Sequence, residues 1–179
     1  MSLKPPVGPH DHVQGNRDAP IELVEYGDYE CPFCARAYWS VKAVQEALGD
    51  DLRFVFRNFP LAQVHPHAIP AAQAAEAAGL QDRFWEMHDI LFEHQDMLGE
   101  TNLFRFAEAL GLDMQRFARD FASPEVAATI RADFLSGARS GVNGTPTFFV
   151  NGERYNGSWA SQDFVAALSS LASNVAAPP

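Results

Sequence analysis

The chain has 179 residues, of which 47% are hydrophobic, and a formal net charge of −10 at pH 7. This size and composition predict one globular domain, or one domain with a large insertion, with enough apolar surface for a real core. The negative charge and the scattered positions of the 13 lysines and arginines argue against nucleic acid or an anionic membrane as a partner.

No apolar run approaches the ~20 residues that a membrane-spanning helix needs, and the first residues lack the hydrophobic stretch of an export signal. As written, the sequence therefore predicts a cytoplasmic protein without membrane insertion. If an export signal has been removed, a periplasmic or other extracytoplasmic location is expected instead.

The N-terminal segment, residues 1–19, is rich in Pro, Gly, His and Asp and has no periodicity, which predicts an extended arm or a frayed terminus. His10 and His12 could bind a metal ion, but a solvated tail is the favoured interpretation. The apolar run 21–26 then predicts a strand, with Glu25 near its end.

The only two cysteines of the chain follow this strand as Cys31-Pro32-Phe33-Cys34, at the start of a helical pattern. Such a spacing in this context predicts a redox dithiol. Backbone N–H groups and the positive end of the helix dipole stabilise a thiolate at this point, so Cys31 is the expected nucleophile. Pro32 fits the first helical turn, where no N–H is needed. Two cysteines supply only half of a tetrahedral zinc site, which disfavours a structural metal site.

The helix after the dithiol predicts which cysteine is buried. Apolar residues recur at helical spacing from Cys34, so Cys34 is expected to face inward and to resolve a mixed disulfide formed by an exposed Cys31. Gly49 is expected to end the helix. The residues of this stripe are Ala37, Val41, Val44 and Leu48.

A second strand is predicted over residues 52–59 and ends at Pro60, so that strand, helix and strand form a unit with parallel strands. His65 and His67 fall in the following loop. They could form one edge of a metal site, but two solvated histidines before a helix are the favoured interpretation.

Residues 66–141 show helical periodicity throughout and predict five helices inserted between strands. Thr101 is a possible N-cap of the third helix, and Asp113 and Ser123 precede the fourth and fifth. Their aromatic residues, Phe134 among them, are expected to be core residues rather than parts of a cofactor site.

Pro146 follows a turn-rich run and precedes a predicted strand, 147–150. A proline there fits a sheet edge, a bulge or a cis bond, and by itself would be interpreted as an ordinary trans loop proline. Asn151-Gly152 is a hairpin signal that leads to a returning strand. A last amphipathic helix carries Phe164, Leu168 and Leu171.

These residues, above all the Cys-Pro-Phe-Cys run after a strand and the distant Gly144-Thr145-Pro146-Thr147-Phe148-Phe149-Val150-Asn151-Gly152 segment, resemble the DsbA-like branch of the thioredoxin superfamily, over about residues 13–171. The resemblance implies an α/β thioredoxin fold, a central mixed sheet flanked by helices, with an inserted all-helical subdomain. No cofactor is implied beyond the redox-active Cys31–Cys34 disulfide or dithiol. The expected parts are an arm 1–19, a first half 20–62, a helical insertion 63–141, a second half 142–174 and a tail 175–179.

The resemblance also implies roles for residues outside the dithiol. Pro146 would be a cis-proline facing the two cysteines, and the backbone of Thr145 would pair with an extended substrate chain. Pro32 and Phe33 would border the same substrate-binding surface. Glu25 matches the family's buried acidic residue, for which we expect a raised pKa and a proton relay to Cys34. An exposed glutamate at the end of a strand is the alternative.

The chain departs from the best-known oxidising members, which carry histidine at the position of Phe33. Without that imidazole we expect a smaller depression of the pKa of Cys31, and a less oxidising couple, than the ~3.5 and ~−120 mV of DsbA. Phe33 could instead form an apolar rim for client proteins with nearby aromatic residues, or these could be packing residues. Those neighbours are Tyr29, Tyr38 and Trp39.

Three functions remain open from the sequence. The first is a protein-disulfide oxidoreductase that acts on protein thiols and disulfides with an unidentified redox partner, in a direction set by its compartment. The second is a thioredoxin-fold binding or chaperone module without significant redox turnover. The third, ranked last, is metal capture through the cysteines and histidines. The sequence does not distinguish a monomer from a dimer.

Overall fold

The computed structural model describes residues 1–176 and is built around a five-stranded mixed sheet with the order β1-β3-β2-β4-β5. β2 and β3 are parallel and are connected through α1, as the sequence predicts, whereas β1, β4 and β5 join the sheet in antiparallel fashion. The strands are β1 (His12–Gly15), β2 (Ile21–Gly27), β3 (Leu52–Asn58), β4 (Thr147–Val150) and β5 (Glu153–Arg154).

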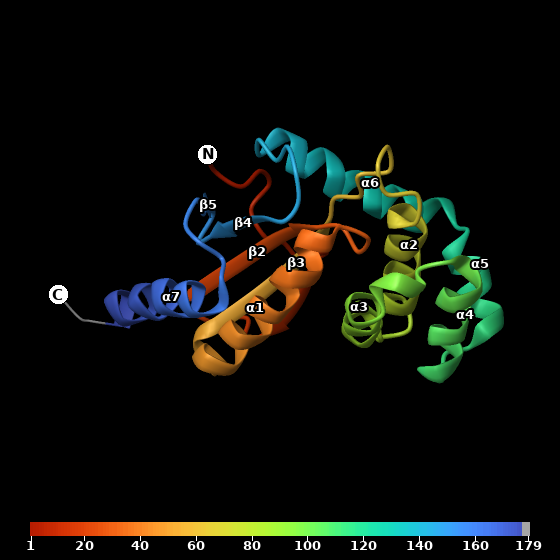
Figure 1. Cartoon of the computed structure of the whole chain (residues 1–179), viewed down its shortest axis with the longest axis horizontal. Helices are drawn as coiled ribbons and strands as arrows, with labels where there is room; N and C mark the ends of the chain where they lie inside the picture. The colour runs from red at the N-terminus through yellow and green to blue at the C-terminus, as the bar shows by residue number, and fades with distance from the viewer. Residues whose placement is uncertain (177–179) are drawn as a thin grey trace.

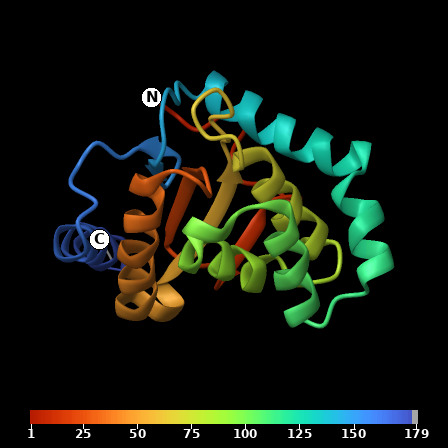
Figure 2. The same cartoon turned by 45° about the vertical axis from the view of Figure 1, so that its right-hand side comes forward.

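Helices flank this sheet and form a separate block between β3 and β4. Figure 1 shows α1 and α7 side by side at one end of the molecule and α2 to α5 at the other, with α6 spanning the distance between them. Figure 2 shows the same block from another side. The helices are α1 (Pro32–Leu48), α2 (Ala68–Gly79), α3 (Phe84–Glu93), α4 (Glu100–Ala109), α5 (Met114–Phe121), α6 (Pro124–Arg139) and α7 (Ser161–Ala176), with short 3-10 turns η1 (Gly49–Asp51) and η2 (Gln95–Met97).

This architecture confirms the predicted α/β thioredoxin fold with an all-helical insertion. α7 continues to Ala176 and so extends two residues into the predicted tail; residues 177–179 lie outside the described part of the chain. No helix within residues 1–176 is both long and apolar enough to span a membrane.

The ends of the inserted helices follow the predicted capping residues in two of three cases. Asp113 accepts a hydrogen bond from the N–H of Arg116, and Ser123 accepts one from the N–H of Val126. The prediction for Thr101 is wrong. α4 begins at Glu100 with Gly99 in the N-cap position, so Thr101 lies inside the first turn.

Residues 1–19 form an extended arm rather than a frayed terminus, and the arm contains a short strand that the sequence did not predict. Residues 12–15 form β1 on the outer edge of β3, and Leu3 is buried. The guanidinium of Arg57 donates to the carbonyls of Pro5 and Pro6 and to the carboxylate of Asp11, which fastens the arm to the sheet. These bonds come from a residue more than 40 positions away, which is why local composition did not reveal them.

His12 is also not solvated. Its Nε2 lies 2.9 Å from Oε2 of Glu76, and its ring stacks on Phe84 with centroids 3.5 Å apart. His10 is exposed, as predicted. The histidine pair therefore does not form a common metal edge.

Alternate residues of β2 serve two cores on opposite faces of the sheet. Leu23 belongs to the core under α1, α7 and the helical block, whereas Val24 and Tyr26 belong to the core under the N-terminal arm. Glu25 follows the register of Leu23 and points toward the face that α1 covers. This register decides the position of its carboxyl group relative to the dithiol.

Candidate active site

The two cysteines lie at the N-terminus of α1, directly after the loop that follows β2. Cys31 is the N-cap residue, and Pro32 occupies the first turn, as predicted. The N–H of Cys31 donates to the carbonyl of Asp28 at 3.1 Å and closes the loop into a turn. Gly27 permits this path, because a Cβ atom there would lie 2.4 Å from Cε2 of Phe56. The dithiol thus sits at the positive end of a 17-residue helix.

The two sulfur groups differ strongly in acidity. The cysteines are free thiols and sit 3.9 Å apart. A hydrogen bond from the side chain of Cys34 is the main cause that lowers the pKa of Cys31 to about 5; burial opposes it, and hydrogen bonds from Thr145 and from backbone groups add to it. Burial raises the pKa of Cys34 well above its usual value, and the hydrogen bond to Cys31 adds to this. Near neutral pH the pair is a thiolate and a thiol.

This arrangement confirms that Cys34 faces inward, with 0% of its surface exposed. Cys31 is less exposed than predicted, at 3%, because the Thr145 carbonyl lies 3.5 Å from its sulfur. The expected difference from DsbA in the pKa of Cys31, caused by Phe33 between the cysteines, stays a prediction.

Thr145 and Pro146 cover the dithiol from the loop before β4. The peptide bond between them is cis, as the resemblance implies. When Cys31 is protonated, its thiol donates to the Thr145 carbonyl, which lies 3.5 Å from its sulfur. The predicted contact between this segment and the dithiol is confirmed, whereas its pairing with a substrate chain stays a prediction.

Glu25 lies in the sheet on the face covered by α1, between Phe56 of β3 and Phe148 of β4, and is only 2% exposed. Burial raises its pKa to about 8, and the charge of Cys31 adds to this effect. Glu25 in turn raises the pKa of Cys34. The predicted burial and raised pKa are confirmed, and an exposed strand-end glutamate is excluded.

Asp28 connects the loop after β2 to the loop after β3. Its Oδ1 accepts a hydrogen bond from the N–H of Glu30 at 2.8 Å. Its Oδ2 accepts from the N–H of Leu61 at 2.8 Å and lies 2.8 Å from Nδ1 of His65. Its own N–H donates to Sγ of Cys34 at 3.5 Å. A single buried carboxylate residue therefore contacts the resolving sulfur and a histidine of the facing loop.

Of the two histidines that the sequence predicts to be solvated, His67 is exposed as predicted, whereas His65 is partly buried. The side chain of His65 is 19% exposed and is bonded to Asp28; that of His67 is 49% exposed, with its Nδ1 2.9 Å from Oε1 of Glu30. Each histidine pairs with a carboxylate of the segment 28–31 between β2 and α1, which we call the redox loop. Among the described residues, no group of three or more His, Cys, Asp or Glu side chains could hold a metal ion.

The sequence and the fold of this chain are similar to those of known thioredoxin-like proteins. A family model described as thioredoxin matches residues 8–170. The chain belongs to the thioredoxin family. A crystal structure of a thioredoxin-like oxidoreductase from Silicibacter pomeroyi DSS-3 is 31% identical, covers 95% of both chains and superposes with a TM-score of 0.81. The structure of Wolbachia pipientis alpha-DsbA1 shares the fold, with a TM-score of 0.81 at 21% identity and 94% coverage of both chains.

The chain also matches one segment of longer curated proteins that are named as Na(+)/H(+) antiporters. The Na(+)/H(+) antiporter NhaA 1 of Mycolicibacterium vanbaalenii is 46% identical over 171 residues. The match covers 94% of this chain but only 28% of the antiporter. The chain therefore spans about a quarter of the length of the curated relatives it matches.

Gln95 is a site residue of this thioredoxin-family protein that the sequence did not reveal. Its side-chain amide donates to the carbonyls of Tyr29 and Cys31, both at 2.8 Å. It comes from η2, so the helical insertion holds the backbone of the redox loop directly. Nothing in the local sequence of Gln95 signals this contact. Asp28, by contrast, could have been suspected as the acidic residue in the turn before the dithiol.

The aromatic residues near the dithiol divide between surface and core. Phe33 and Trp39 are 52% and 60% exposed, and the guanidinium of Arg36 lies 4.7 Å from the centre of the Phe33 ring. Tyr29 and Tyr38 are buried and pack on other aromatic rings. The proposed rim thus contains at most Phe33 and Trp39; the two tyrosines are packing residues.

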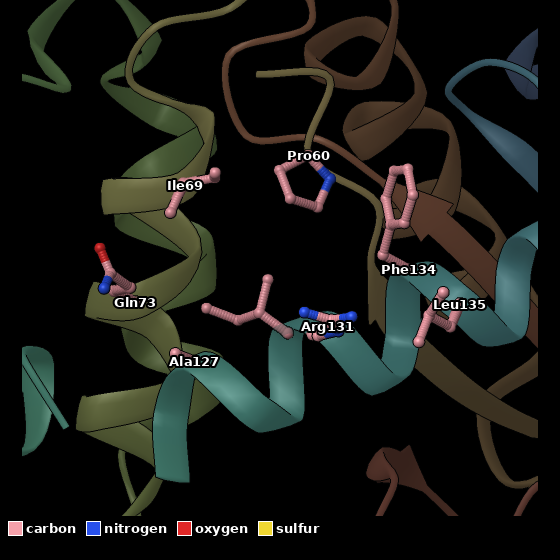
Figure 3. A pocket seen from close by; sticks show the side chains of 8 residues that line it. Pro60, Ile69, Gln73, Ala127, Arg131, Phe134 and Leu135 are labelled. Carbon is pink, nitrogen blue, oxygen red and sulfur yellow. The ribbon is translucent and has the colours of Figure 1, made fainter. Parts of the chain in front are cut away.

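An apolar groove lies between α2, α6 and the loop after β3 (Figure 3). Ile69 of α2 and Phe134 of α6 border it, with Pro60 between them. Phe134, predicted as a core residue, is 37% exposed; its ring stacks on Phe59 with centroids 4.4 Å apart and leaves its outer part on the groove. The loop after β3 that contributes Pro60 to the groove also carries His65.

Proposed function

We propose that this thioredoxin-family protein is a DsbA-like protein-disulfide oxidoreductase that exchanges thiols and disulfides with protein substrates through Cys31 and Cys34. The opposite shifts of the two pKa values carry this proposal, because they give one ionised attacker and one protonated partner within reach of each other. The position of the pair under Thr145 and Pro146 supports it.

The exchange balances in both directions. In reduction, the Cys31 thiolate attacks one sulfur of a substrate disulfide, forms a mixed disulfide and releases a substrate thiolate. Cys34 then loses its proton and attacks Sγ of Cys31, which releases the second substrate thiolate and leaves the Cys31–Cys34 disulfide. Two electrons pass to the substrate. The reverse sequence oxidises two substrate thiols and regenerates the dithiol.

Glu25 is the proposed acceptor of the Cys34 proton. A carboxyl with a pKa of about 8 exists in both protonation states near neutral pH, which suits it to both directions of the exchange. Thr145 and Pro146, with Pro32 and Phe33, are the proposed substrate-binding residues, where the backbone of Thr145 would pair with an extended chain.

Cation antiport is not part of this proposal. The match to the antiporter of Mycolicibacterium vanbaalenii covers 94% of this chain but only 28% of the antiporter. The compartment, and with it the net direction of electron flow, follows from the reduction potential of the couple relative to that of its surroundings.

Reduction of insulin by dithiothreitol, with and without the protein, tests the proposal. We expect the wild type to accelerate insulin reduction and Cys31→Ser to lose this activity, because serine provides no thiolate. Equal activity of the two proteins would contradict the oxidoreductase proposal. A Cys31→Ser variant that still suppresses the aggregation of an unfolded client would favour the binding-module alternative.

Phe33→His is expected to make the couple more oxidising. An imidazolium beside the nucleophile stabilises the thiolate of the reduced form, and a tenfold change in the equilibrium constant corresponds to ~30 mV. We expect an increase of about that size or larger in equilibrium with glutathione. Phe33→Leu is the matched control, with an apolar side chain retained, and should leave the potential close to that of the wild type. If Phe33→His and Phe33→Leu raise the reduction potential equally, the charge of the imidazolium is excluded as the cause.

A further inference from the structure

The redox loop faces a second loop that carries a histidine in a constrained position. His65 lies in the segment between β3 and α2, and its side chain is 19% exposed. Its Nδ1 is held 2.8 Å from Oδ2 of Asp28, an oxygen that also accepts the Leu61 N–H. The imidazole of His65 is therefore held by Asp28, a residue that is itself only 1% exposed and is bonded to the backbone of the same loop.

Asp28 connects this histidine to both cysteines. The carbonyl of Asp28 accepts from the N–H of Cys31 at 3.1 Å, and its N–H donates to Sγ of Cys34 at 3.5 Å. A negative charge on Asp28 so close to the dithiol opposes ionisation of Cys31. A positive charge on His65 offsets it.

Resting on the proposed function, we propose that His65 is a positioning residue for the redox chemistry: held by Asp28, its imidazolium stabilises the Cys31 thiolate from the facing loop. It would supply, across the fold, a positive charge that the Cys-Pro-Phe-Cys run itself lacks. Because stabilising the thiolate favours the reduced form, His65 would also make the couple more oxidising.

The charges around His65 are consistent with this role. Burial lowers the pKa of His65, but the hydrogen bond and charge of Asp28 outweigh it, and the charges of Cys31 and Glu30 raise the pKa further, so that the net pKa lies above the ordinary value of 6.5. Glu30 is itself paired with His67. All the groups that raise the pKa of His65 thus belong to the redox loop.

The expected size of the effect is modest. Hydrogen bonds from Cys34 and Thr145 are among the main causes of the low pKa of Cys31, and His65 is not among them. We therefore expect loss of the imidazolium to lower the thiolate fraction of Cys31 near pH 5 by roughly threefold to fivefold rather than to abolish ionisation.

Alkylation of the reduced, full-length protein by iodoacetamide across pH 4 to 8 tests the proposal, because the rate follows the fraction of thiolate. His65→Gln, which keeps a hydrogen-bonding group but no positive charge, should react roughly threefold to fivefold more slowly than the wild type near pH 5. His65→Lys, with a charge restored, should recover part of the rate. His67→Gln is the matched control on the same loop and should react like the wild type.

Two results would overturn the proposal: a His65→Gln profile identical to that of the wild type, or an equal shift in His67→Gln, which would indicate a general disturbance of the loop. If His65→Gln does not fold, as judged by circular dichroism, His65→Asn replaces it as the uncharged variant, with the same slower reaction expected and the same result overturning the proposal. Alkylation measures ionisation without substrate turnover. If the wild type fails to accelerate insulin reduction, the proposed function is contradicted, but the alkylation rates still test the role of His65.

Discussion

Cys34→Ser is expected to convert the protein into a trap that holds client proteins in a mixed disulfide. Cys31 retains its ionised sulfur in this variant and still attacks, but the second attack has no thiol. Cys34 is 0% exposed and its thiol hydrogen-bonds Cys31, so its attack is intramolecular and directed. A thiol from solution attacks the mixed disulfide much more slowly than the positioned Cys34 does, so we expect turnover of insulin to fall by ~100-fold or more in Cys34→Ser.

Non-reducing electrophoresis after incubation with oxidised, unfolded client protein measures the trap. We expect covalent adducts with Cys34→Ser that dithiothreitol removes, and none with Cys31→Ser. Serine at position 34 keeps an O–H donor where Cys34 has its S–H, so Cys31 should remain ionised in the variant and adducts should form without loss of the attacking thiolate. Adducts in equal yield with both variants would show that either sulfur can attack and would refute the assigned order.

Much of this site could be predicted from the sequence because its chemistry is local. The spacing of Cys31 and Cys34 after a strand places both residues at one helix N-terminus, and a stripe of apolar residues shows that Cys34 faces the core. The burial of Cys31 was not predictable in this way, because it depends on the distant Thr145 segment. Pro146 is different. Its turn-rich surroundings alone would favour an ordinary trans proline, and only the resemblance of the whole segment to a known family implied the cis bond that the structure contains.

Other parts of the site depend on contacts between distant residues, which no local pattern reveals. Asp28 and His65 are 37 positions apart, and Gln95 reaches the carbonyl of Cys31 across 64 positions. His65 is a loop residue, as the turn residues around it predict, but they do not reveal that its ring contacts a carboxylate on another loop.

The face of Glu25 illustrates a further limit. β2 is buried on both faces, so its apolar run lacks the alternation that would have shown which way the carboxyl points. β1 was missed for the opposite reason, since its four residues are mostly polar and only their pairing with β3 makes them a strand. In both cases the partner strand supplies the missing information.

Glu25→Gln is expected to stabilise the protein at alkaline pH and to leave its stability nearly unchanged at acidic pH. A group with a higher pKa in the folded state stabilises the fold below its unfolded pKa and loses that contribution as the pH rises through its folded pKa. For Glu25 the window runs from 4.5 to about 8. Glutamine carries no charge at any pH, so the free energy of unfolding of the variant should exceed that of the wild type by on the order of 4 kcal/mol at the upper end.

Urea unfolding of the oxidised protein across this pH range is the suitable measurement. In the reduced protein Cys31, with its lowered pKa, contributes stability that increases with pH and would partly conceal the loss. With the disulfide formed Cys31 no longer titrates, and burial, the larger cause of the Glu25 shift, remains. Asp133, whose pKa burial raises to about 7, acts in the same direction as Glu25 but is present in both proteins and cancels in the difference.

Glu46→Gln, the same change at an exposed position of α1, should follow the wild type at every pH. A Glu25→Gln profile parallel to that of the wild type would mean that Glu25 is ionised in the folded protein at neutral pH, and the carboxyl could not then deliver a proton to Cys34.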